Sequence, residues 1–307
     1  MNAKKIVLGV VEPDIDPRDV VDRAAWIAAL NGASLELLLC DADVDALSET
    51  AFVSNEAREM AARIRTAQEE LVDELAAPAR KRAVEVVAGV LDRRPIADAI
   101  VHVALDRHPL FVVKGTRYHS EAERASLLDT DWQLIRGCPY PLWLVKPHPL
   151  ANRPVVIAAV DPMHEGVRMA TLDDLLIEHA KALAAAAGGE AHLLHVYQPL
   201  TGVGAAATLN FKPIRLSVGD ISERMGKEHR ENLDALAAKH GIDERHVRQL
   251  PGSALDLLPW VAREQKADVF VMGAVAGSAR SGGVVGRTVE RVLDHLPCDV
   301  LILRPEA

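Results

Sequence analysis

The sequence predicts an α/β protein built from two tandem, doubly wound domains. The chain has 307 residues, enough for two domains that each bury their own core. Short, nearly continuous runs of Val, Ile and Leu alternate with longer segments of helical period, and this order recurs in the second half. Such runs are typical of parallel strands covered on both faces. Each domain is therefore expected to hold a five-stranded, mainly parallel sheet flanked by helices.

The repeat is visible at three places in each half. IVLGVVEP at 6–13 matches VVIAAVDP at 155–162, and PLFVVKG, ending at Gly115, matches DVFVMGA, whose glycine is Gly273. PLWLVKP, ending at 147, matches DVLILRP, ending at 305. A period this long excludes a solenoid of small repeats. We expect domains at 1–147 and 154–307, joined by a short linker at 148–154.

The apolar pattern predicts the individual elements. Strands are expected at 4–11, 34–40, 83–89, 109–114 and 140–146, then at 154–160, 190–197, 245–250, 267–272 and 299–304. Helices are expected at 17–31, 54–79, 94–107 and 128–137, then at 167–187, 218–240, 253–265 and 286–295. Ligands of doubly wound sheets bind beyond the carboxyl ends of the strands. Glu12 and Asp161 follow the first strand of each half.

Composition restricts the class of partner. Apolar residues make up 49% of the chain, charged residues 26%, and the net charge is -9. An acidic protein without a basic stripe is not expected to bind nucleic acid. No apolar run approaches the length of a membrane span, and the N-terminus lacks the pattern of a secretory signal. The three cysteines are far apart in sequence. We therefore expect a cytoplasmic protein in a reducing compartment.

A long motif lies at the end of the first half. It reads TDWQLIRGCPYPLWLVK over 130–146 and includes Trp132 and Trp143. With the duplicated strand-acid-proline start, this motif resembles the universal stress protein family, tandem type, and most of all its E-type members. The resemblance implies two domains of the adenine nucleotide alpha hydrolase-like fold and a role in stress resistance. It favours a ligand-responsive binding protein over a dedicated enzyme, and some members of the family bind ATP.

Members of this family associate through the last strands of their domains. The resemblance therefore implies that strands 140–146 and 299–304 pair within the chain as a pseudo-dimer, with Trp143 and Leu301 where they meet. It leaves open a further homodimer.

ATP-binding members carry the fingerprint G-x-x-G, nine residues, then G-[S/T]. Glycine lets backbone amides approach phosphates, and a helix N-terminus attracts anions. In the second half Ala276 replaces the inner glycine, and Arg287 occupies the hydroxyl position. A glycine-rich connection without a ligand is the competing interpretation. If ATP binds here, with Asp161 at a ribose hydroxyl, the candidate nucleotide-binding residues are Asp161, Gly273, Gly277, Gly283, Gly286, Arg287 and Thr288.

The loop of the first half departs further from the fingerprint. Thr116, Arg117 and Tyr118 follow Gly115, and Leu128 and Asp129 occupy the closing positions. Aspartate there repels phosphate but suits a helix cap. We expect no ATP in this half, and a pocket that is filled by its own side chains or holds an apolar ligand.

The remaining residues point to no catalytic or metal site. Two enzyme or ligand alternatives stay open: a weak ATPase or phosphotransferase in the second half, and a binder of a lipid-like metabolite in the first-half pocket. The segment 199–218 of the second half could cover the pocket there or contact the first half. Several side chains are expected to serve packing or to face solvent: His192 and His195 in the core or a pocket, Cys138, Cys298, Trp132, Trp143 and Trp260 as packing residues, and His240 and His246 at the surface.

Overall fold

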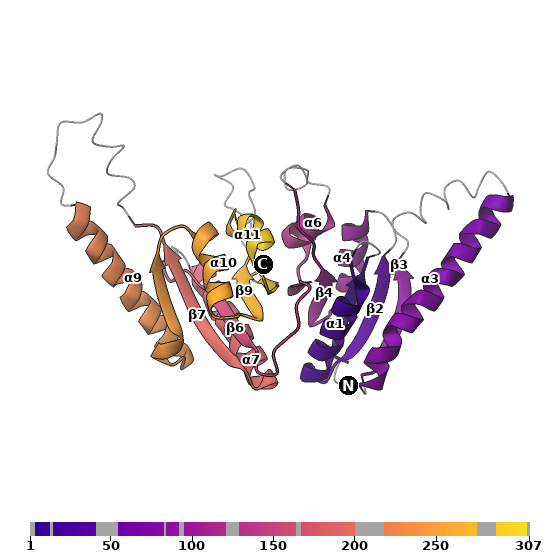
Figure 1. Ribbon diagram of the computed structural model, residues 1–307, viewed down its shortest axis with the longest axis horizontal. Helices are drawn as coiled ribbons and strands as arrows, with labels where there is room; N and C mark the ends of the chain where they lie inside the picture. The colour runs from indigo at the N-terminus through magenta and orange to yellow at the C-terminus, as the bar shows by residue number, and fades with distance from the viewer. Residues whose placement is uncertain are drawn as a thin grey trace, which may run out of the picture. The chain divides into compact units, whose positions relative to one another are not determined.

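The computed structural model describes residues 4–12, 15–40, 55–82, 84–91, 95–120, 129–163, 167–199, 218–274 and 287–305. The chain divides into two compact units, which are drawn in Figure 1. The first unit contains the described residues of 1–149, Ala274 and the segment Cys298–Arg304. The second contains the described residues of 150–273, the segment Arg287–Pro297 and Pro305.

The first unit is built on a sheet with the strand order β3-β2-β1-β4-β5-β10. Strands β1 to β5 run parallel, and β10 lies antiparallel on β5. Their bounds are β1 Ile6–Val11, β2 Ser34–Cys40, β3 Val86–Leu91, β4 Phe111–Gly115, β5 Leu142–Val145 and β10 Asp299–Leu303. Strand β5 is buried along its whole length, as near-continuous apolar strands in a covered sheet should be.

Helices cover this sheet, with α1 and α3 packed beside strands β1, β2 and β3 (Figure 1). The helices are α1 Pro17–Asn31, α3 Asn55–Lys81, α4 Ile96–Arg107 and α6 Thr130–Gly137. Helix α1 begins where the carboxylate of Asp16 accepts from the backbone N–H of Arg18. It ends at Gly32, whose φ of 58° is the left-handed conformation that glycine adopts readily.

The second unit repeats this arrangement in its sheet order β9-β6-β7-β8, all parallel where the register is defined. Its strands are β6 Val155–Ala159, β7 Glu190–Tyr197, β8 Val247–Pro251 and β9 Val269–Gly273. Its helices are α7 Val167–Ala187, α9 Val218–His240, α10 Ala254–Glu264 and α11 Arg287–Val292, with short 3-10 helices η2 Glu244–His246 and η4 Leu293–His295. The first strand β6 lies between β7 and β9, as β1 lies between β2 and β4.

The predicted pairing of segments 140–146 and 299–304 is confirmed. Strands β5 and β10 pair antiparallel, with Trp143 opposite Leu301. The final strand of the sequence therefore completes the sheet of the first unit. Both partners are short strands with buried side chains, and pairing them covers an edge that would otherwise present open N–H and C=O groups.

The fold class and the expected elements are confirmed, with adjusted bounds, but β10 lies in the sheet of the first unit, so the described sheets have six and four strands and not five each. Every predicted strand and helix has a counterpart among the described residues. One difference concerns the last helix, expected at 286–295. Helix α11 ends at Val292 and continues as a tighter 3-10 turn, so that Leu293 is buried and Leu296 leads toward β10.

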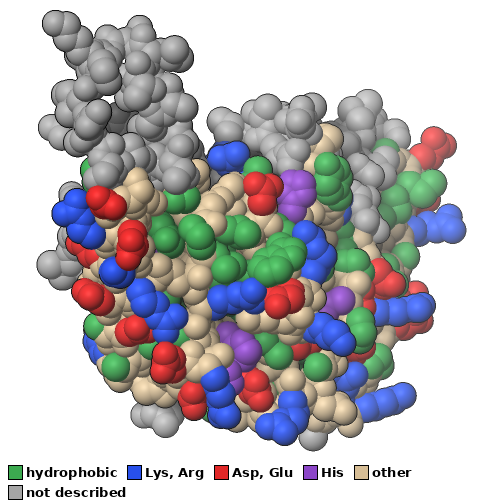
Figure 2. Space-filling view, turned by 60° about the vertical axis from the view of Figure 1, so that its left-hand side comes forward, with side chains coloured by type: hydrophobic (Ala, Val, Ile, Leu, Met, Phe, Trp, Pro, Cys, Tyr) green, Lys and Arg blue, Asp and Glu red, His purple; other side chains and the backbone are tan. Residues whose placement is uncertain are grey.

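No described helix is both long and apolar enough to cross a membrane. On the face that Figure 2 shows, acidic and basic side chains are interspersed. That face offers a polyanion no continuous basic track.

Candidate functional site

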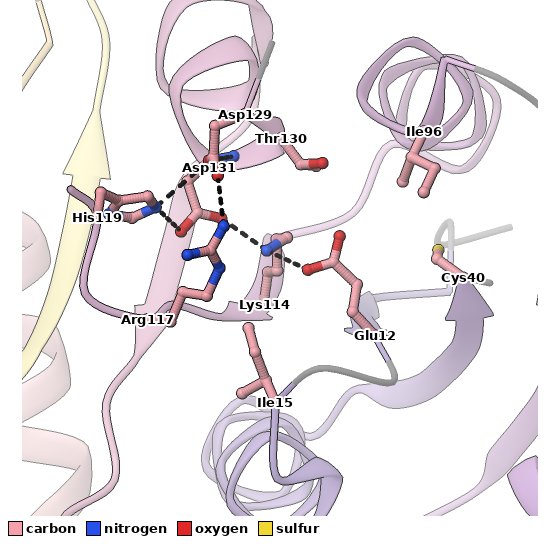
Figure 3. Close-up of a pocket in the computed structure, with 10 residues that line it drawn as sticks. All are labelled: Glu12, Ile15, Cys40, Ile96, Lys114, Arg117, His119, Asp129, Thr130 and Asp131. Carbon is pink, nitrogen blue, oxygen red and sulfur yellow. Dashed lines mark hydrogen bonds and ion pairs between the residues drawn. The ribbon is translucent and has the colours of Figure 1, made fainter. Parts of the chain in front are cut away.

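A pocket opens beyond the carboxyl ends of β1 and β4 in the first unit, where the doubly wound sheet predicts a ligand site (Figure 3). Its centre is the ammonium group of Lys114, which comes from the end of β4 and is almost fully buried. The pocket is lined by Glu12, Ile15, Cys40, Ile96, Lys114, Arg117, His119, Asp129, Thr130 and Asp131.

Two carboxylates hold the ammonium of Lys114. Its Nζ lies 2.5 Å from Oε2 of Glu12 and 2.6 Å from Oδ1 of Asp131. The third donor position faces the carbonyl oxygen of Gly115 at 3.0 Å. An ammonium has three donors, so these partners satisfy it completely. The cluster therefore lines the pocket beyond the strand ends with paired charges, as Figure 3 shows.

The second oxygen of Asp131 is held as firmly as the first. Thr116 donates its hydroxyl to Oδ2 at 2.6 Å, and Nε2 of the buried His119 lies 3.3 Å from the same oxygen. The neighbouring Asp129 caps helix α6, where its carboxylate accepts from the backbone N–H of Asp131 at 2.8 Å. The predicted helix-capping role of Asp129 is confirmed. Arg117 lies 3.4 Å from the other oxygen of Asp129.

Burial and pairing act in opposite directions on these groups. Burial alone would lower the pKa of Lys114, but the charges of Asp131 and Glu12 and their hydrogen bonds raise it above its ordinary value. Burial would raise the pKa of Asp131, yet Lys114 and the hydrogen bonds of His119 and Thr116 hold it well below its usual range. At Glu12 the effect of burial outweighs the opposing charge and hydrogen bond of Lys114, so the pKa of Glu12 is raised. Burial, with the charge of Glu12, also raises the pKa of Cys40 to about 12, so this thiol stays protonated.

The second unit carries different residues at the corresponding places. Aligning Gly115 with Gly273 sets Met272 in the place of Lys114. Aligning 130–147 with 288–305, which are equally long, sets Val289 in the place of Asp131. Both Met272 and Val289 are buried and apolar. The positions that correspond to Lys114 and Asp131 therefore carry no charge in the second unit.

The structure places three of the predicted nucleotide-binding residues. The side chain of Asp161 is about half exposed, and its carboxylate accepts from the backbone N–H of Met163 at 3.4 Å. Asp161 lines a pocket between α7 and α9, whereas Thr288 lines another with Gln198 and Ser253. Among the described residues these two pockets are separate. Gly277, Gly283, Gly286 and the side chain of Arg287 lie outside the described residues.

The glycine at the end of the fourth strand lies close to a neighbouring side chain in both units. A Cβ on Gly273 would come within 2.5 Å of Cδ2 of Leu172, which belongs to α7. A Cβ on Gly115 would come within 2.6 Å of Cγ2 of Ile15. Real carbon atoms do not approach so closely, so a larger residue at either position would force Leu172 or Ile15 to shift.

Comparison with known sequences decides the family. The sequence model of the Universal stress protein family matches residues 2–146 and 170–304. The chain belongs to the universal stress protein family. Universal stress protein E of Salmonella typhi is 27% identical over 303 residues, covering 98% of this chain and 94% of the relative. Universal stress protein E of Escherichia coli K12 matches with the same identity and coverage.

Solved structures share the fold over the whole chain. A protein of Pseudomonas aeruginosa UCBPP-PA14 assigned to the universal stress proteins superposes with a TM-score of 0.70 at 24% identity, covering 99% of this chain and 94% of its own. A universal stress protein of Archaeoglobus fulgidus gives a TM-score of 0.65 at 17% identity, with coverages of 98% and 96%. The predicted tandem architecture is thereby confirmed.

Sequence reasoning missed an aromatic cluster beside Asp161 in this universal stress protein. Nδ1 of the buried His195 lies 3.0 Å from the carbonyl oxygen of Val160, so it carries a proton. Its Nε2 then faces Nδ1 of His229 at 2.7 Å, and the ring of Tyr197 stacks on His229 at 4.5 Å. His195 lies 3.9 Å from the carboxylate of Asp161. The sequence feature that indicates this cluster is the i, i+2 spacing of His195 and Tyr197 at the carboxyl end of β7, which puts both side chains on one face of the sheet.

Several expectations about single residues are settled by burial. Cys138, Cys298, Trp132 and Trp143 are packed in the interior, as predicted. The prediction that Trp260 packs inside was wrong, because its side chain is 44% exposed and Arg248 lies over its ring. The prediction of a solvent-facing His240 was also wrong. Its ring is largely buried and its Nε2 lies 2.6 Å from the carboxylate of Asp174, which supplies the polar partner that burial demands.

Proposed function

We propose that this chain is a cytoplasmic stress-response binding protein in which the second half binds an adenine nucleotide and the first half has lost that capacity. The observation that carries the proposal is the difference between the residues at corresponding positions of the two units. In the first unit Lys114 and Asp131 form an ion cluster that lines the pocket. In the second unit Met272 and Val289 stand in their places, and Asp161 keeps a half-exposed carboxylate.

The surroundings of Asp161 suit a nucleoside. A carboxylate beyond the carboxyl end of the first strand can accept from ribose hydroxyls. The rings of Tyr197 and His229 stack on each other beside His195, which lies 3.9 Å from the carboxylate of Asp161, so aromatic side chains of the kind on which purines stack are near this acid. The retained outer glycines, Gly273 and Gly286, support a phosphate-binding loop through the resemblance to ATP-binding members of the family.

The alternative ligand and the alternative activity are less well supported. A lipid-like molecule in the first-unit pocket would have to displace or desolvate Glu12, Lys114 and Asp131, which costs several kcal/mol for each buried charge. A phosphotransfer enzyme needs a metal site and a positioned base at the nucleotide. Ligand binding without a dedicated chemical step is therefore the function we propose.

Calorimetric titration of the whole chain with ATP and magnesium tests the proposal. We expect one nucleotide per chain, and affinity about tenfold or more weaker in Asp161→Ala, because a hydrogen bond to a charged group contributes about 1.5–3 kcal/mol. Glu12→Gln, the matched change in the first unit, should leave the affinity unchanged. Absence of binding, or equal losses in both variants, would refute the assignment to the second half.

A further inference from the structure

Two histidines and a glutamate meet at the amino end of strands β7 and β8 in the second unit. This end of the sheet is opposite to the carboxyl end where Asp161 and Tyr197 lie, so the cluster is separate from the nucleotide site proposed above. Its members are Glu190, His192 and His246, and one ligand atom from each lies within 4.8 Å of the others.

The fold brings these residues together by simple rules. Glu190 and His192 are two places apart on β7, which puts both side chains on one face of the sheet. Strand β8 runs parallel to β7 with Leu193 opposite Val247, so His246 reaches the sheet beside His192. The 3-10 turn that presents His246 is capped by Asp243, which accepts from the backbone N–H of Arg245 at 3.0 Å.

The distances suit a small divalent cation. Nε2 of His192 lies 3.4 Å from Oε2 of Glu190, and Nε2 of His246 lies 3.7 Å from the same oxygen. Ligand atoms about 2.0–2.2 Å from a tetrahedral zinc ion stand roughly 3.3–3.6 Å apart. The two distances from the glutamate oxygen are close to this spacing.

A second partner orients His192. Its Nδ1 lies 3.0 Å from Oε1 of Gln265, the residue that ends helix α10. An amide oxygen only accepts, so Nδ1 carries a proton and Nε2 is the ring nitrogen turned toward Glu190. Such outer hydrogen bonds orient metal-binding histidines in general.

The second histidine must turn to bind an ion shared with the first. The rings of His192 and His246 lie stacked, with centroids 4.5 Å apart and planes 12° apart. Because Gln265 holds His192, the ring of His246 would rotate to direct its lone pair at a shared ion.

We propose that Glu190, His192 and His246 form a binding site for a divalent transition-metal ion of the zinc type. Two imidazoles and one carboxylate are a donor set that zinc accepts, with water as the fourth ligand. Arg245 lies 3.4 Å from Asp243, and Arg153 donates to the carbonyl of Gly188, so each nearby guanidinium has a partner outside the site.

A competing cluster in the first unit is less suited to a cation. His119, Asp129 and Asp131 also bring ligand atoms together. The ammonium of Lys114 lies 2.6 Å from Asp131, and its positive charge opposes a metal ion there. Asp129 is already used as the cap of α6.

Titration of the EDTA-treated full chain with zinc chloride tests the proposal, with cobalt(II) absorption as the second readout. We expect one zinc per chain, a rise in the unfolding temperature, and visible bands of a tetrahedral cobalt ion. His246→Gln and His192→Gln should abolish zinc binding and the cobalt bands. Gln265→Ala should weaken zinc binding about tenfold or more. The matched control is His102→Gln, which changes an exposed histidine on α4 and should change nothing.

Circular dichroism without metal verifies that each variant is folded. Zinc binding that persists in both histidine variants, or absence of binding at 100 μM zinc (about 10⁻⁴ M, a weak affinity), would overturn the proposal. Loss of binding in His102→Gln as well would mean that scattered surface histidines hold the ion. Loss of ATP binding leaves this test unaffected, since the two sites lie at opposite ends of the sheet.

Discussion

Lys114 shows how one residue decides the chemistry of a pocket. A lysine within an otherwise apolar strand is buried at a cost that only nearby carboxylates offset. Glu12 and Asp131 provide that compensation from two other elements. The duplicated half carries Met272 in its place and needs neither partner.

Replacing Lys114 by its counterpart makes a first prediction. Lys114→Met should lower the free energy of unfolding by about 3–5 kcal/mol, because the buried Asp131 loses its countercharge. The double variant Lys114→Met/Asp131→Val, which copies the second unit, should be more stable than the single variant. Urea unfolding curves measure both.

An exposed lysine provides the control for that experiment. Lys227 pairs with Glu223 across one helical turn, and both side chains are mostly exposed. Lys227→Met should change the free energy of unfolding by less than about 0.5 kcal/mol. A similarly small effect of Lys114→Met would show that the buried cluster contributes little to stability.

The sequence is more informative about these elements than about their side-chain partners. Alternation of apolar runs and helical segments located every strand and helix, since burial and periodicity are local properties of the chain. The partner of Lys114 is 17 residues away at Asp131, and His246 meets His192 only through the parallel register of β7 and β8. Such contacts depend on which strands are neighbours and in what register, which a single sequence does not state.

At the scale of elements, the pairing of β5 and β10 explains much of the 130–146 motif. The indole N–H of Trp143 donates to Oδ2 of Asp299 at 2.8 Å, and the backbone N–H of Lys146 donates to Oδ1 at 2.9 Å. Nε of Arg23, on α1, lies 2.7 Å from the same carboxylate. A fully buried aspartate at the start of β10 is therefore neutralised by residues of the first half.

His148 makes this junction sensitive to pH. Burial lowers the pKa of His148, but its hydrogen bond to Asp299 and the charge of that carboxylate outweigh burial and raise the pKa above 6.5. Nearby Arg23 acts in the opposite direction. A raised pKa in the folded state means that the charged histidine stabilises the fold below about pH 6.5, and that this contribution disappears as the pH rises through the folded value.

The second prediction follows from the raised pKa of His148. The difference in unfolding free energy between the natural chain and His148→Gln should be larger at pH 6 than at pH 9. Denaturant unfolding at both values measures the difference, and subtracting the variant removes the titration of the other histidines. A difference that grows toward high pH would contradict the assigned partner.

At the scale of the molecule, the first unit depends on residues from the far end of the chain. Without Cys298–Arg304 the fragment 1–149 has an open edge at β5 and an Arg23 without the carboxylate of Asp299. We predict that this fragment self-associates through β5 or is less stable than the same unit in the whole chain. Light scattering and thermal unfolding measure both properties.

Adding a peptide of residues 298–305 should reverse the self-association of the fragment, because it supplies the missing strand. The matched control is the same peptide with Asp299 replaced by Asn, which keeps the strand but weakens the contacts with Arg23 and Trp143. A fragment that is monomeric and as stable as the unit in the whole chain would show that β10 is dispensable there.

The late arrival of β10 also has a consequence during synthesis. Trp143 and the carboxylate that accepts from it are 156 residues apart. At about 5–20 residues per second, a ribosome needs roughly 8–30 s to supply that partner. During this interval the nascent first unit has no intramolecular cover for its last strand, and any chain released before residue 299 keeps that strand open. Completion of translation thus becomes a condition for finishing the part of the protein that is made first.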